Sequence, residues 1–475
     1  MVEVIILIPF IVAGFVYLCF STRIRRLSLT LTGIVHLFLS INLWIIQPEA
    51  WFKDYLKLSP EGILTLLVTS VLFVMISFYT VGYLKAHHIH GEHIFVASIL
   101  CFLSTMTLVV LSDHLIILWI AIEATTLASA PLIFVERTPK SLEATIKYIL
   151  ICSVGIALAL LGLIFIKIAR EIGRVETPFL FSELIKVAKQ LDEKWLKAGF
   201  IFIFVGYGTK MGLAPMHTWL PDAHSEAPSP ASALLSGVLL NCAYLGIFKT
   251  HQILYAAGLG YFSGNILIIF GLISIFTAAI FILKQSDYKR LLAYSSIENM
   301  GIIAFGTGIG GIAAYGAMLH LIHHSLIKSS LFLSSGNIYL RYNSKIINDI
   351  GNMVKFLPKT FVAFFGGFIG ISGFPPFGIF MSEFLIIIGA FQKGYYASGI
   401  FFIAILSILL AGFSNYCIKM GFDKSNVPES NFNENYALIL PQYVMLGISL
   451  ILCFWIPDSL YDIILKAICS IGGGY

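Results

Sequence analysis

Two stretches of the sequence interrupt long apolar segments in the same way: KMGLAPMHTWLPD at residues 210–222 and ISGFPPFGIFMSE at residues 371–383. Each contains glycine, then proline, then an aromatic residue, close to an ionisable residue. Proline breaks a helix, and broken backbone at membrane depth is tolerated only where it is buried in protein or lines a cavity. The pair predicts two corresponding broken helices beside an ion pathway. Kinks used only for packing are the alternative.

The composition fits a membrane protein and excludes other classes. Of 475 residues, 12% are Asp, Glu, Lys or Arg and 58% are hydrophobic, whereas a soluble domain carries about 25% charged residues. Disorder needs low hydrophobicity, and the strands of a membrane β-barrel alternate in polarity, so neither fits. The predicted fold class is an all-α polytopic membrane protein in the lipid bilayer. A basic stripe for nucleic acid is absent from the sequence, so no nucleic-acid partner is expected.

The seven cysteines form no C-x-x-C pair, so disulfides, iron–sulfur clusters and zinc sites are not expected. The sequence has no glycine-rich phosphate loop, and no nucleophile stands beside a base. It therefore predicts no cofactor, no bound metal and no catalytic centre of its own.

A helix that crosses a bilayer needs about 20 mostly apolar residues. About fourteen stretches of the sequence meet this requirement. Their approximate limits are 3–22, 28–46, 61–83, 93–111, 114–135, 143–168, 197–214, 229–249, 261–283, 289–309, 311–335, 360–390, 397–418 and 437–456. Segment 169–196 is longer than the other connections on the outer side and carries charges of both signs. It is expected to form an amphipathic helix outside the membrane.

Lysine and arginine gather in alternate connections between these stretches, and cytoplasmic loops are the ones that carry such an excess. The basic connections include those with Arg23 to Arg26, Arg137 and Lys140, and Lys284 to Arg290. This bias predicts that these loops lie inside the cell and that both termini lie on the outer side of the membrane.

The two broken spans are the seventh and the twelfth, five apart. This spacing predicts five-helix repeats, and an odd number of helices inverts the second copy relative to the first. The predicted parts are N-terminal helices 1–3 at residues 1–92, a first repeat of helices 4–8 at 93–250, an inverted second repeat of helices 9–13 at 259–420, and a C-terminal helix 14 with a tail at 421–475.

Charge inside a bilayer is costly, so each buried charged group needs a partner or a role. Glu123 lies well inside the fifth span, and Lys210 precedes the first break. We expect the two to pair, either as members of a proton path or as a static salt bridge. Lys249 lies at the end of the eighth span. Its side chain is expected either to be buried in the span or to extend to the outer surface.

His320, His324 and Lys328 follow one another at intervals of four residues in the eleventh span, which puts them on one helix face. Histidine exchanges protons near neutral pH, and a buried lysine can join it. This face predicts a hydrated proton relay, with polar packing as the alternative. Glu383, after the second break, is a candidate terminal proton carrier.

Other polar residues give weaker signals. Glu143 and Lys147 are spaced to form a salt bridge at the membrane boundary. Glu298 is expected near the inner surface. The segment HTWLPDAHSEAPSP at residues 217–230 either lines an inner entrance for protons or caps helices.

Four motifs resemble, in order, the signatures of one family. They are MGLAPMHTWLPDAHSEAPSPASALLSG (211–237), DYKRLLAYSSIENMG (287–301), HHSLIKSSLFLSSG (323–336) and GFPPFGIFMSEF (373–384). Over roughly residues 60–420 the chain is similar to the antiporter-like membrane subunits of respiratory complex I, group 4 hydrogenases and Mrp cation/proton antiporters. Within that family it most resembles the component F branch of hydrogenase-4 and related formate hydrogenlyase complexes.

The resemblance implies fourteen helices in two inverted repeats and a set of proton-carrying residues. These are Glu123, Lys210, Lys249, His320, His324, Lys328 and Glu383. In this reading Glu123 pairs with Lys210, and Lys249 is the buried lysine that links two half-channels. Ser325 and Ser329 replace the small or apolar residues usual in the family, so hydration beside the histidine–lysine motif is expected to differ.

The implied function is that of a proton-translocating membrane subunit, which couples the redox chemistry of a complex I-like or energy-converting hydrogenase complex to ion transport. The expected partners are other membrane subunits, including a quinone- or hydrogenase-type connecting subunit, and a soluble redox arm, all at a prokaryotic cell membrane. An Mrp-type antiporter or a related inorganic-carbon transport complex is the alternative. A membrane anchor with inert buried charges is the third reading.

Overall fold

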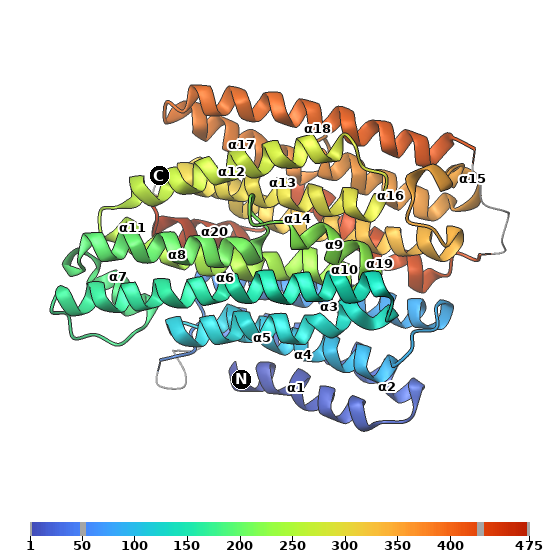
Figure 1. Cartoon of the computed structure of the whole chain (residues 1–475), viewed down its shortest axis with the longest axis horizontal. Coiled ribbons are helices and arrows are strands. Elements are labelled where there is room, and N and C mark those ends of the chain that lie inside the picture. Colours follow the sequence, from blue (N-terminus) through green and yellow to red (C-terminus); the bar gives the residue numbers. More distant parts are fainter. Residues whose placement is uncertain (1, 48–53, 425–431, 473–475) are drawn as a thin grey trace.

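The computed structural model describes residues 2–47, 54–424 and 432–472, and these residues form helices and loops with only isolated β-bridges. The helices run side by side in one bundle, with α1 and α2 at one edge and α18 at the opposite edge (Figure 1). Residues 425–431 and 473–475 of the predicted C-terminal region lie outside the described residues.

The helices follow the predicted order. Before the first repeat come α1 (Val2–Leu18), α2 (Thr22–Ile46) and α3 (Pro60–Ala86). The first repeat region holds α4 (Glu92–Leu111), α5 (Leu115–Ile133), α6 (Pro139–Ile172), α7 (Phe181–Lys186), α8 (Glu193–Met211), α9 (Trp219–Glu226), α10 (Ser229–Leu234) and α11 (Leu240–Ala256). The second holds α12 (Gly260–Ile282), α13 (Tyr288–Ile309), α14 (Ile312–Tyr342), α15 (Met353–Phe356), α16 (Pro358–Ile371), α17 (Gly378–Gln392) and α18 (Tyr396–Phe422). The chain continues with α19 (Tyr436–Phe454) and α20 (Asp458–Cys469).

Each of the fourteen predicted spans has a counterpart among these helices. Nine described helical stretches are long and apolar enough to cross a membrane by length and composition alone. The other spans miss that criterion because α1 has 17 residues, α8 carries several charged residues, α13 and α14 carry many buried polar side chains, and the span of α16 and α17 is divided into two short helices. The interrupted spans are α8 with α9, and α16 with α17. The chain is thus a multi-pass helical membrane protein.

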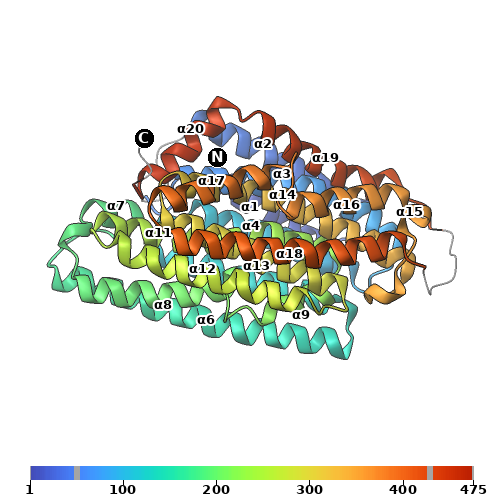
Figure 2. The same ribbon diagram turned by 90° about the horizontal axis from the view of Figure 1, so that it is seen from above.

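The bundle has two ends, which we name after the short helices that lie there. At the α15 end, Arg26 at the start of α2 pairs with Glu92 at the start of α4 at 2.7 Å. Asn435 caps α19 at this end, where Glu434 accepts a 2.6 Å hydrogen bond from the backbone of Thr360. The basic loops of the sequence therefore gather at the α15 end. The start of α1 and helix α20 lie toward the opposite, α7 end (Figures 1 and 2).

Two local predictions are wrong. Segment 169–196 is not one amphipathic helix: α6 extends to Ile172, a loop follows, and only the six residues of α7 are helical before a short 3₁₀ turn. The chain also forms an amphipathic helix after the last span, which the sequence reading left as a tail. This helix, α20, buries Ile463, Ile464 and Ile468 against the bundle.

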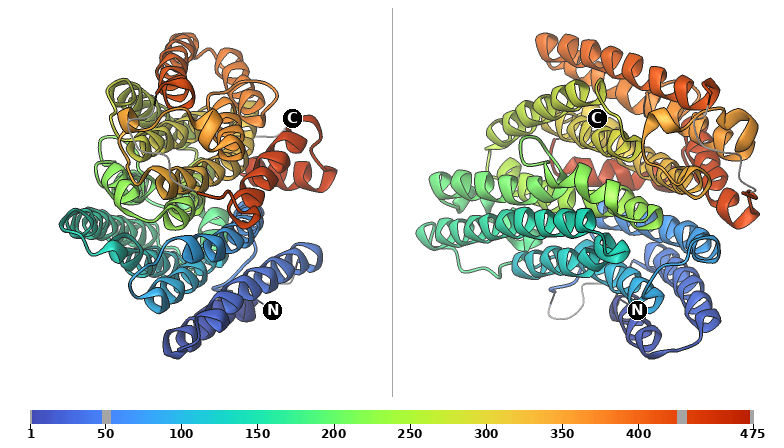
Figure 3. Two further views of the ribbon diagram at one scale, coloured as in Figure 1. Left: turned by 90° about the vertical axis from the view of Figure 1, so that its right-hand side faces the viewer. Right: turned by 45° about the vertical axis from the view of Figure 1, so that its right-hand side comes forward.

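Helices α6 and α8 approach closely because glycines face each other. A side-chain carbon on Gly206 would lie 2.5 Å from the carbonyl oxygen of Gly155, and one on Gly162 would lie 2.7 Å from that of Gly199. Small residues at such crossings let membrane helices pack by direct backbone contact. This packing fixes the end of α8, where Lys210 lies. In the end-on view, helices α19 and α20 lie between the N-terminal helices and the helices of the predicted second repeat (Figure 3).

Candidate functional site

The first cluster of polar groups surrounds Lys210, whose side chain is fully buried. Its Nζ donates hydrogen bonds of 2.7 Å to the hydroxyls of Thr126 and Tyr148. The Thr126 hydroxyl donates in turn to Oε2 of Glu123 at 3.3 Å, and Ser153 donates to Oε1 at 2.8 Å. The structure therefore brings Lys210 and Glu123 into one cluster. A threonine hydroxyl lies between them in place of the expected direct pair, and no ion pair joins them among the described residues.

Tyr148 completes the environment of the Lys210 ammonium. Nζ lies 4.7 Å from the centroid of the tyrosine ring, a distance at which the ring face attracts a cation. The Tyr148 hydroxyl is 2.6 Å from the Ser129 hydroxyl, which donates at 2.7 Å to the carbonyl oxygen of Thr125. Tyr148 therefore accepts from Lys210 and donates to Ser129. A buried ammonium needs such acceptors to offset its lost hydration.

Both helix breaks contain a glycine in the left-handed region, Gly212 with φ of +82° and Gly373 with φ of +69°. Side chains rarely adopt this conformation, so glycine is required at both turns. Each break also contains a cis X–Pro peptide bond. A side-chain carbon on Gly373 would lie 2.2 Å from Oε2 of Glu383. The carboxylate of Glu383, which is 8% exposed, thus lies directly against the second break.

The second cluster repeats the arrangement of lysine, hydroxyl and carboxylate. Lys328 on α14 is fully buried and donates close hydrogen bonds to the carbonyl oxygen of Leu292 and the hydroxyl of Ser295, both on α13. Glu298 lies one turn beyond Ser295, is 3% exposed, and its Oε2 has no hydrogen-bond partner among the described residues. Glu298 therefore lies inside the bundle, and the expectation that it sits near the inner surface is wrong.

His320 ties α14 to two other helices. Its Nδ1 lies 2.9 Å from the Ser382 hydroxyl on α17, and its Nε2 lies 2.9 Å from Oδ1 of Asn299 on α13. Oδ1 of Asn299 can only accept, so Nε2 carries the proton of that hydrogen bond, and the Ser382 hydroxyl is the partner of Nδ1. His320 thus connects the helix that carries Glu298 with the helix that carries Glu383.

The three histidines of α14 have different surroundings. His324 is fully buried, and neither ring nitrogen has a hydrogen-bond partner among the described residues. Buried polar atoms of this kind are normally satisfied by ordered water. His323 points elsewhere, with Nδ1 at 3.0 Å from the Ser449 hydroxyl on α19. His320 and His324 therefore share the relay face with Lys328, and His323 does not.

Asn241 joins the first repeat region to α14. It follows a π-helical segment, Leu235–Leu239, and its Nδ2 donates at 2.7 Å to the hydroxyl of Ser325, the residue after His324. Its Oδ1 is buried without a hydrogen-bond partner among the described residues. Asn241 is thus the polar residue of α11 that lies next to the histidine–lysine face.

Lys249 lies two turns further along α11, toward the α7 end. Its side chain is 1% exposed, so it does not extend to the surface. Its Nζ donates at 2.6 Å to the carbonyl oxygen of Ser112, the C-cap residue of α4, and lies 5.4 Å from the ring centroid of Phe181. The structure therefore places Lys249 at one end of the bundle, whereas Asn241 of α11 donates a hydrogen bond to α14.

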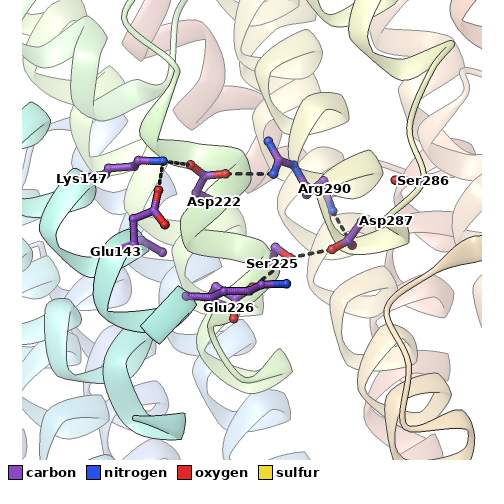
Figure 4. Close-up of a pocket in the computed structure, with 10 residues that line it drawn as sticks. Glu143, Lys147, Asp222, Ser225, Glu226, Ser286, Asp287 and Arg290 are labelled. Carbon is purple, nitrogen blue, oxygen red and sulfur yellow. Dashed lines mark hydrogen bonds and ion pairs between the residues drawn. The ribbon is translucent and has the colours of Figure 1, made fainter. Parts of the chain in front are cut away.

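A charged pocket of about 340 Å³ opens at the α15 end, between α6, α9 and the start of α13 (Figure 4). Asp222 lies at its centre and forms ion pairs of 3.1 Å with both Lys147 and Arg290. Glu143 pairs with Lys147 at 2.6 Å, which confirms the predicted boundary salt bridge. Ser225 donates to Asp287 across the pocket at 2.6 Å.

Segment 217–230, most of which forms α9, divides its candidate residues His217, Asp222, His224 and Glu226 between the pocket and the interior. Asp222 and Glu226 line the pocket, and Glu226 pairs with Lys345 at 3.1 Å. His224 is fully buried and stacks on Phe332 with ring centroids 4.7 Å apart. Of the four candidate residues, the two acids thus face the pocket, whereas His224 lies on the side of Lys328.

Sequence reasoning missed several members of these clusters, namely Thr126, Tyr148, Asn241, Asn299 and Ser382. Two of these residues could have been found because they are polar residues inside apolar stretches. Thr126 follows Glu123 by one helical turn, and Asn241 interrupts the apolar segment 234–248. Tyr148 gave no such signal because tyrosine is common in membrane helices as a packing residue.

Comparisons with known proteins show what the chain as a whole resembles. The hydrogenase-4 component F homolog of Methylacidiphilum infernorum (isolate V4) is 42% identical over 291 residues, which are 61% of this chain and 61% of that protein. Hydrogenase-4 component B of Escherichia coli (strain K12) is 31% identical over 350 residues, 71% of this chain and 51% of that protein. The matched parts thus span about half to three fifths of these relatives.

Two solved structures show the same fold over nearly the whole chain. One is the membrane-bound sulfane sulfur reductase, an archaeal respiratory membrane complex, with a TM-score of 0.86, 20% identity, and coverage of 99% of this chain and 97% of that one. The other is the Mrp complex from Dietzia sp. DQ12-45-1b, with a TM-score of 0.84, 16% identity and the same coverage. Residues 112–413 match the model of the family described as NADH:quinone oxidoreductase/Mrp antiporter, transmembrane, and the chain belongs to that family.

Proposed function

We propose that the chain is the proton-translocating, antiporter-like membrane subunit of an energy-converting complex of the complex I or group 4 hydrogenase type. One observation carries this proposal: two buried lysine clusters, around Lys210 and Lys328, each hold a hydroxyl and a carboxylate, and a hydrogen bond from Asn241 to Ser325 joins α11 to α14. Buried ionisable groups in a membrane protein mark ion pathways. The subunit would couple redox chemistry in its partners to ion transport and would hold no redox centre of its own.

The first cluster stores and releases a proton. When Lys210 is charged, Thr126 and Tyr148 accept its hydrogen bonds, and the Thr126 hydroxyl donates its own hydrogen bond to Glu123. A proton that reaches Glu123 weakens the attraction on the ammonium, because the carboxylate charge is lost. Lys210 can then give up its proton toward the interior.

The second cluster receives the proton through α11 and α14. Asn241 and Ser325 form the hydrogen-bonded contact between the halves. Water at the unpartnered nitrogens of His324 would continue the path to Lys328, and His320 would connect it to α17. Glu383 then serves as the terminal carrier beside the second break.

The pocket around Asp222 is the proposed entrance for protons. Its charged residues lie at the α15 end, which the basic loops assign to the cytoplasm. With that orientation, both termini lie on the outer side of a prokaryotic cell membrane. We take residues 93–250 and 259–420 as the two inverted repeats, since each contains one glycine-turned, proline-broken helix.

The complex would contain further membrane subunits, among them a quinone- or hydrogenase-type connecting subunit, and a soluble redox arm. The likeness to hydrogenase-4 component F and component B proteins supports this assignment. Within it, component F of hydrogenase-4 is the proposed counterpart.

The test uses the intact complex in sealed vesicles and compares Lys210→Met with Lys167→Met. Lys167 is an exposed lysine of α6 that pairs with Glu171, so it provides a matched loss of charge away from the clusters. We expect Lys210→Met to abolish proton translocation while a dye is still reduced by the redox arm. Translocation that survives both Lys210→Met and Glu123→Gln would rule out the relay.

An Mrp-type antiporter subunit is the second candidate function, since the fold also matches a subunit of the Mrp complex. An antiporter moves protons against sodium without electron transfer. Sodium uptake driven by an imposed pH gradient, in vesicles that lack any electron donor, would favour this candidate. Proton translocation that requires an electron donor and proceeds in sodium-free buffer favours the first.

A further inference from the structure

A second pocket, of about 200 Å³, lies at the α7 end, opposite the proposed entrance. It is formed by the start of α3, the α4–α5 connection, the end of α11 and helix α20, which covers this end of the bundle (Figure 2). Charged and amide side chains that line it are Lys57, Glu61, Asp113, Lys249, Gln252 and Lys466, together with three serines. The relay described above leaves these groups without a role.

Glu61 differs from its neighbours because its carboxylate has no hydrogen bond or ion pair with any residue that the structure describes. It is nevertheless only 5% exposed. Asp113, by contrast, accepts hydrogen bonds from the hydroxyl and the backbone N–H of Ser182. Lys249 donates to the backbone of Ser112. A buried carboxylate without a partner is costly unless water or an ion reaches it, and Glu61 faces a pocket that can hold water.

Several positive groups lie around the carboxylate of Glu61. It lies in the first turn of α3, where the helix dipole attracts negative charge. Lysines approach from three separate elements: Lys57 from the preceding loop, Lys249 from α11 and Lys466 from α20. Asp113 is the only other acid among the residues that line the pocket, and its hydrogen bonds to Ser182 occupy it.

A polar stripe leads from Glu61 into the bundle. Thr65 and Thr69 follow at intervals of four residues, so all three lie on one face of α3 and extend over about 12 Å. Both threonines are buried, with hydroxyls that donate to the carbonyl oxygens of Glu61 and Thr65 and keep acceptor sites free. Leu72, on the same face, lies 3.2 Å from where a side-chain carbon on Gly237 would be.

Gly237 lies where the face of α3 that carries this stripe, at Leu72, meets the segment before α11. It is four residues before Asn241, whose amide donates to the backbone oxygen of Gly237 at 3.0 Å. A side-chain carbon on Gly237 would also touch Ser329 and the backbone of Ser325 on α14. The face of α3 that begins at Glu61 therefore ends beside the contact that joins the two lysine clusters.

We propose that Glu61 is a proton-exchange site through which the centre of the relay communicates with the α7 end of the bundle. The carboxylate accepts a proton from water in the threonine stripe, and the resulting carboxylic acid gives it to water in the pocket, which restores the carboxylate. The ammonium groups of Lys57, Lys249 and Lys466 favour the release step because they attract the carboxylate that forms. This inference rests on the proposed proton translocation and makes the exchange at Glu61 a step that each turnover needs in addition to Glu383.

The test measures the proton flux driven by electron transfer in liposomes that hold the full complex and an entrapped pH-sensitive dye. Four variants are compared: Glu61→Gln, Glu61→Asp, Lys210→Met and Glu171→Gln. Glu171 is an exposed acid of the same end, paired with Lys167, and serves as the matched control. Flux is expressed per assembled complex, so a lower yield of a variant does not alter the comparison.

We expect Glu61→Gln to lower the flux at least about tenfold, while Glu61→Asp retains most of it and Glu171→Gln retains all of it. Rescue by aspartate separates a proton carrier from a residue needed only for packing. Flux in Glu61→Gln equal to that of the unmodified complex, together with loss in Lys210→Met, would overturn the inference and leave the proposed function intact. Unchanged flux in both variants would overturn the proposed function itself. Intact proton flux in Glu61→Gln together with lost sodium uptake would also overturn the inference about Glu61, since the site would then bind sodium.

Discussion

Lys210 reaches Glu123 through the hydroxyl of Thr126, which accepts a 2.7 Å hydrogen bond from the lysine and donates a 3.3 Å hydrogen bond to the carboxylate. A direct ion pair inside a membrane would hold both charges tightly, because the low dielectric strengthens their attraction. An intervening hydroxyl weakens that attraction and offers a proton of its own. The cluster is therefore suited to changing its protonation state rather than to a static salt bridge.

Replacing Thr126 by valine tests the role of this hydroxyl. Thr126→Val keeps the shape of the side chain and removes both hydrogen bonds, so we expect proton translocation to fall about tenfold. The stability of the complex should fall by only about 1 kcal/mol, as for other interhelical hydrogen bonds in membranes. The control is Thr105→Val, since the Thr105 hydroxyl bonds only to the backbone of its own helix. An equal effect of both changes on translocation would contradict the assignment.

The close crossing of α6 and α8 predicts a stability effect. In Gly206→Ala the new methyl would lie 2.5 Å from the carbonyl oxygen of Gly155, and overpacking of this kind costs about 1–3 kcal/mol. The thermal unfolding temperature of the solubilised complex should fall. Gly447→Ala is the matched control, because nothing lies within 4 Å of a side-chain carbon there. No difference between the two variants would mean that the helices are not packed this closely.

Asn241 is predicted to carry the connection between the clusters. Asn241→Leu removes the hydrogen bond to Ser325 and one buried amide, so we expect translocation to be lost while both lysines keep their own hydrogen bonds. Proton uptake in sealed vesicles measures this. Asn42→Leu is the control, since Asn42 is exposed on α2 and bonds only to its own helix. Normal uptake in Asn241→Leu would show that protons cross between the halves elsewhere.

Glu298 is predicted to be the carboxylate partner of Lys328. Glu298→Gln keeps the size of the side chain and removes the charge, so the second cluster could no longer alternate between a charged and a neutral carboxyl group. We expect translocation to fall at least about tenfold, with assembly preserved. The matched control is Glu193→Gln, in an exposed pair with Lys197. Wild-type translocation in Glu298→Gln would remove this residue from the path.

The sequence was sufficient for the membrane class, the fourteen spans and the two breaks, because apolar length and proline are local signals. It was also sufficient for the face of α14, since a period of four residues fixes which side chains align. It did not reveal the hydroxyl between Glu123 and Lys210, because that contact joins residues 84 positions apart. The residues alone left burial and surface extension of Lys249 open for the same reason: its acceptor, Ser112, lies at the C-cap of another helix.

The position of Glu298 was misjudged for a different reason. Its segment begins with Asp287, Lys289 and Arg290, which suggested the membrane surface. Asp287 is the N-cap of α13, so the helix starts there and carries Glu298 about 15 Å inward by its rise of 1.5 Å per residue. The boundary of the helix, rather than the charge of the segment, decides the depth of the residue.

The central claim is that the two lysine clusters act in series. It is tested most directly by the ratio of protons translocated to electrons transferred in sealed vesicles that hold the complex with Lys328→Met. If the clusters act in series, this single change reduces the ratio to zero, as Lys210→Met does, while electron transfer from the redox arm continues. A ratio that stays at half of its original value or above in Lys328→Met, with Lys210→Met still at zero, would contradict a single path through both clusters.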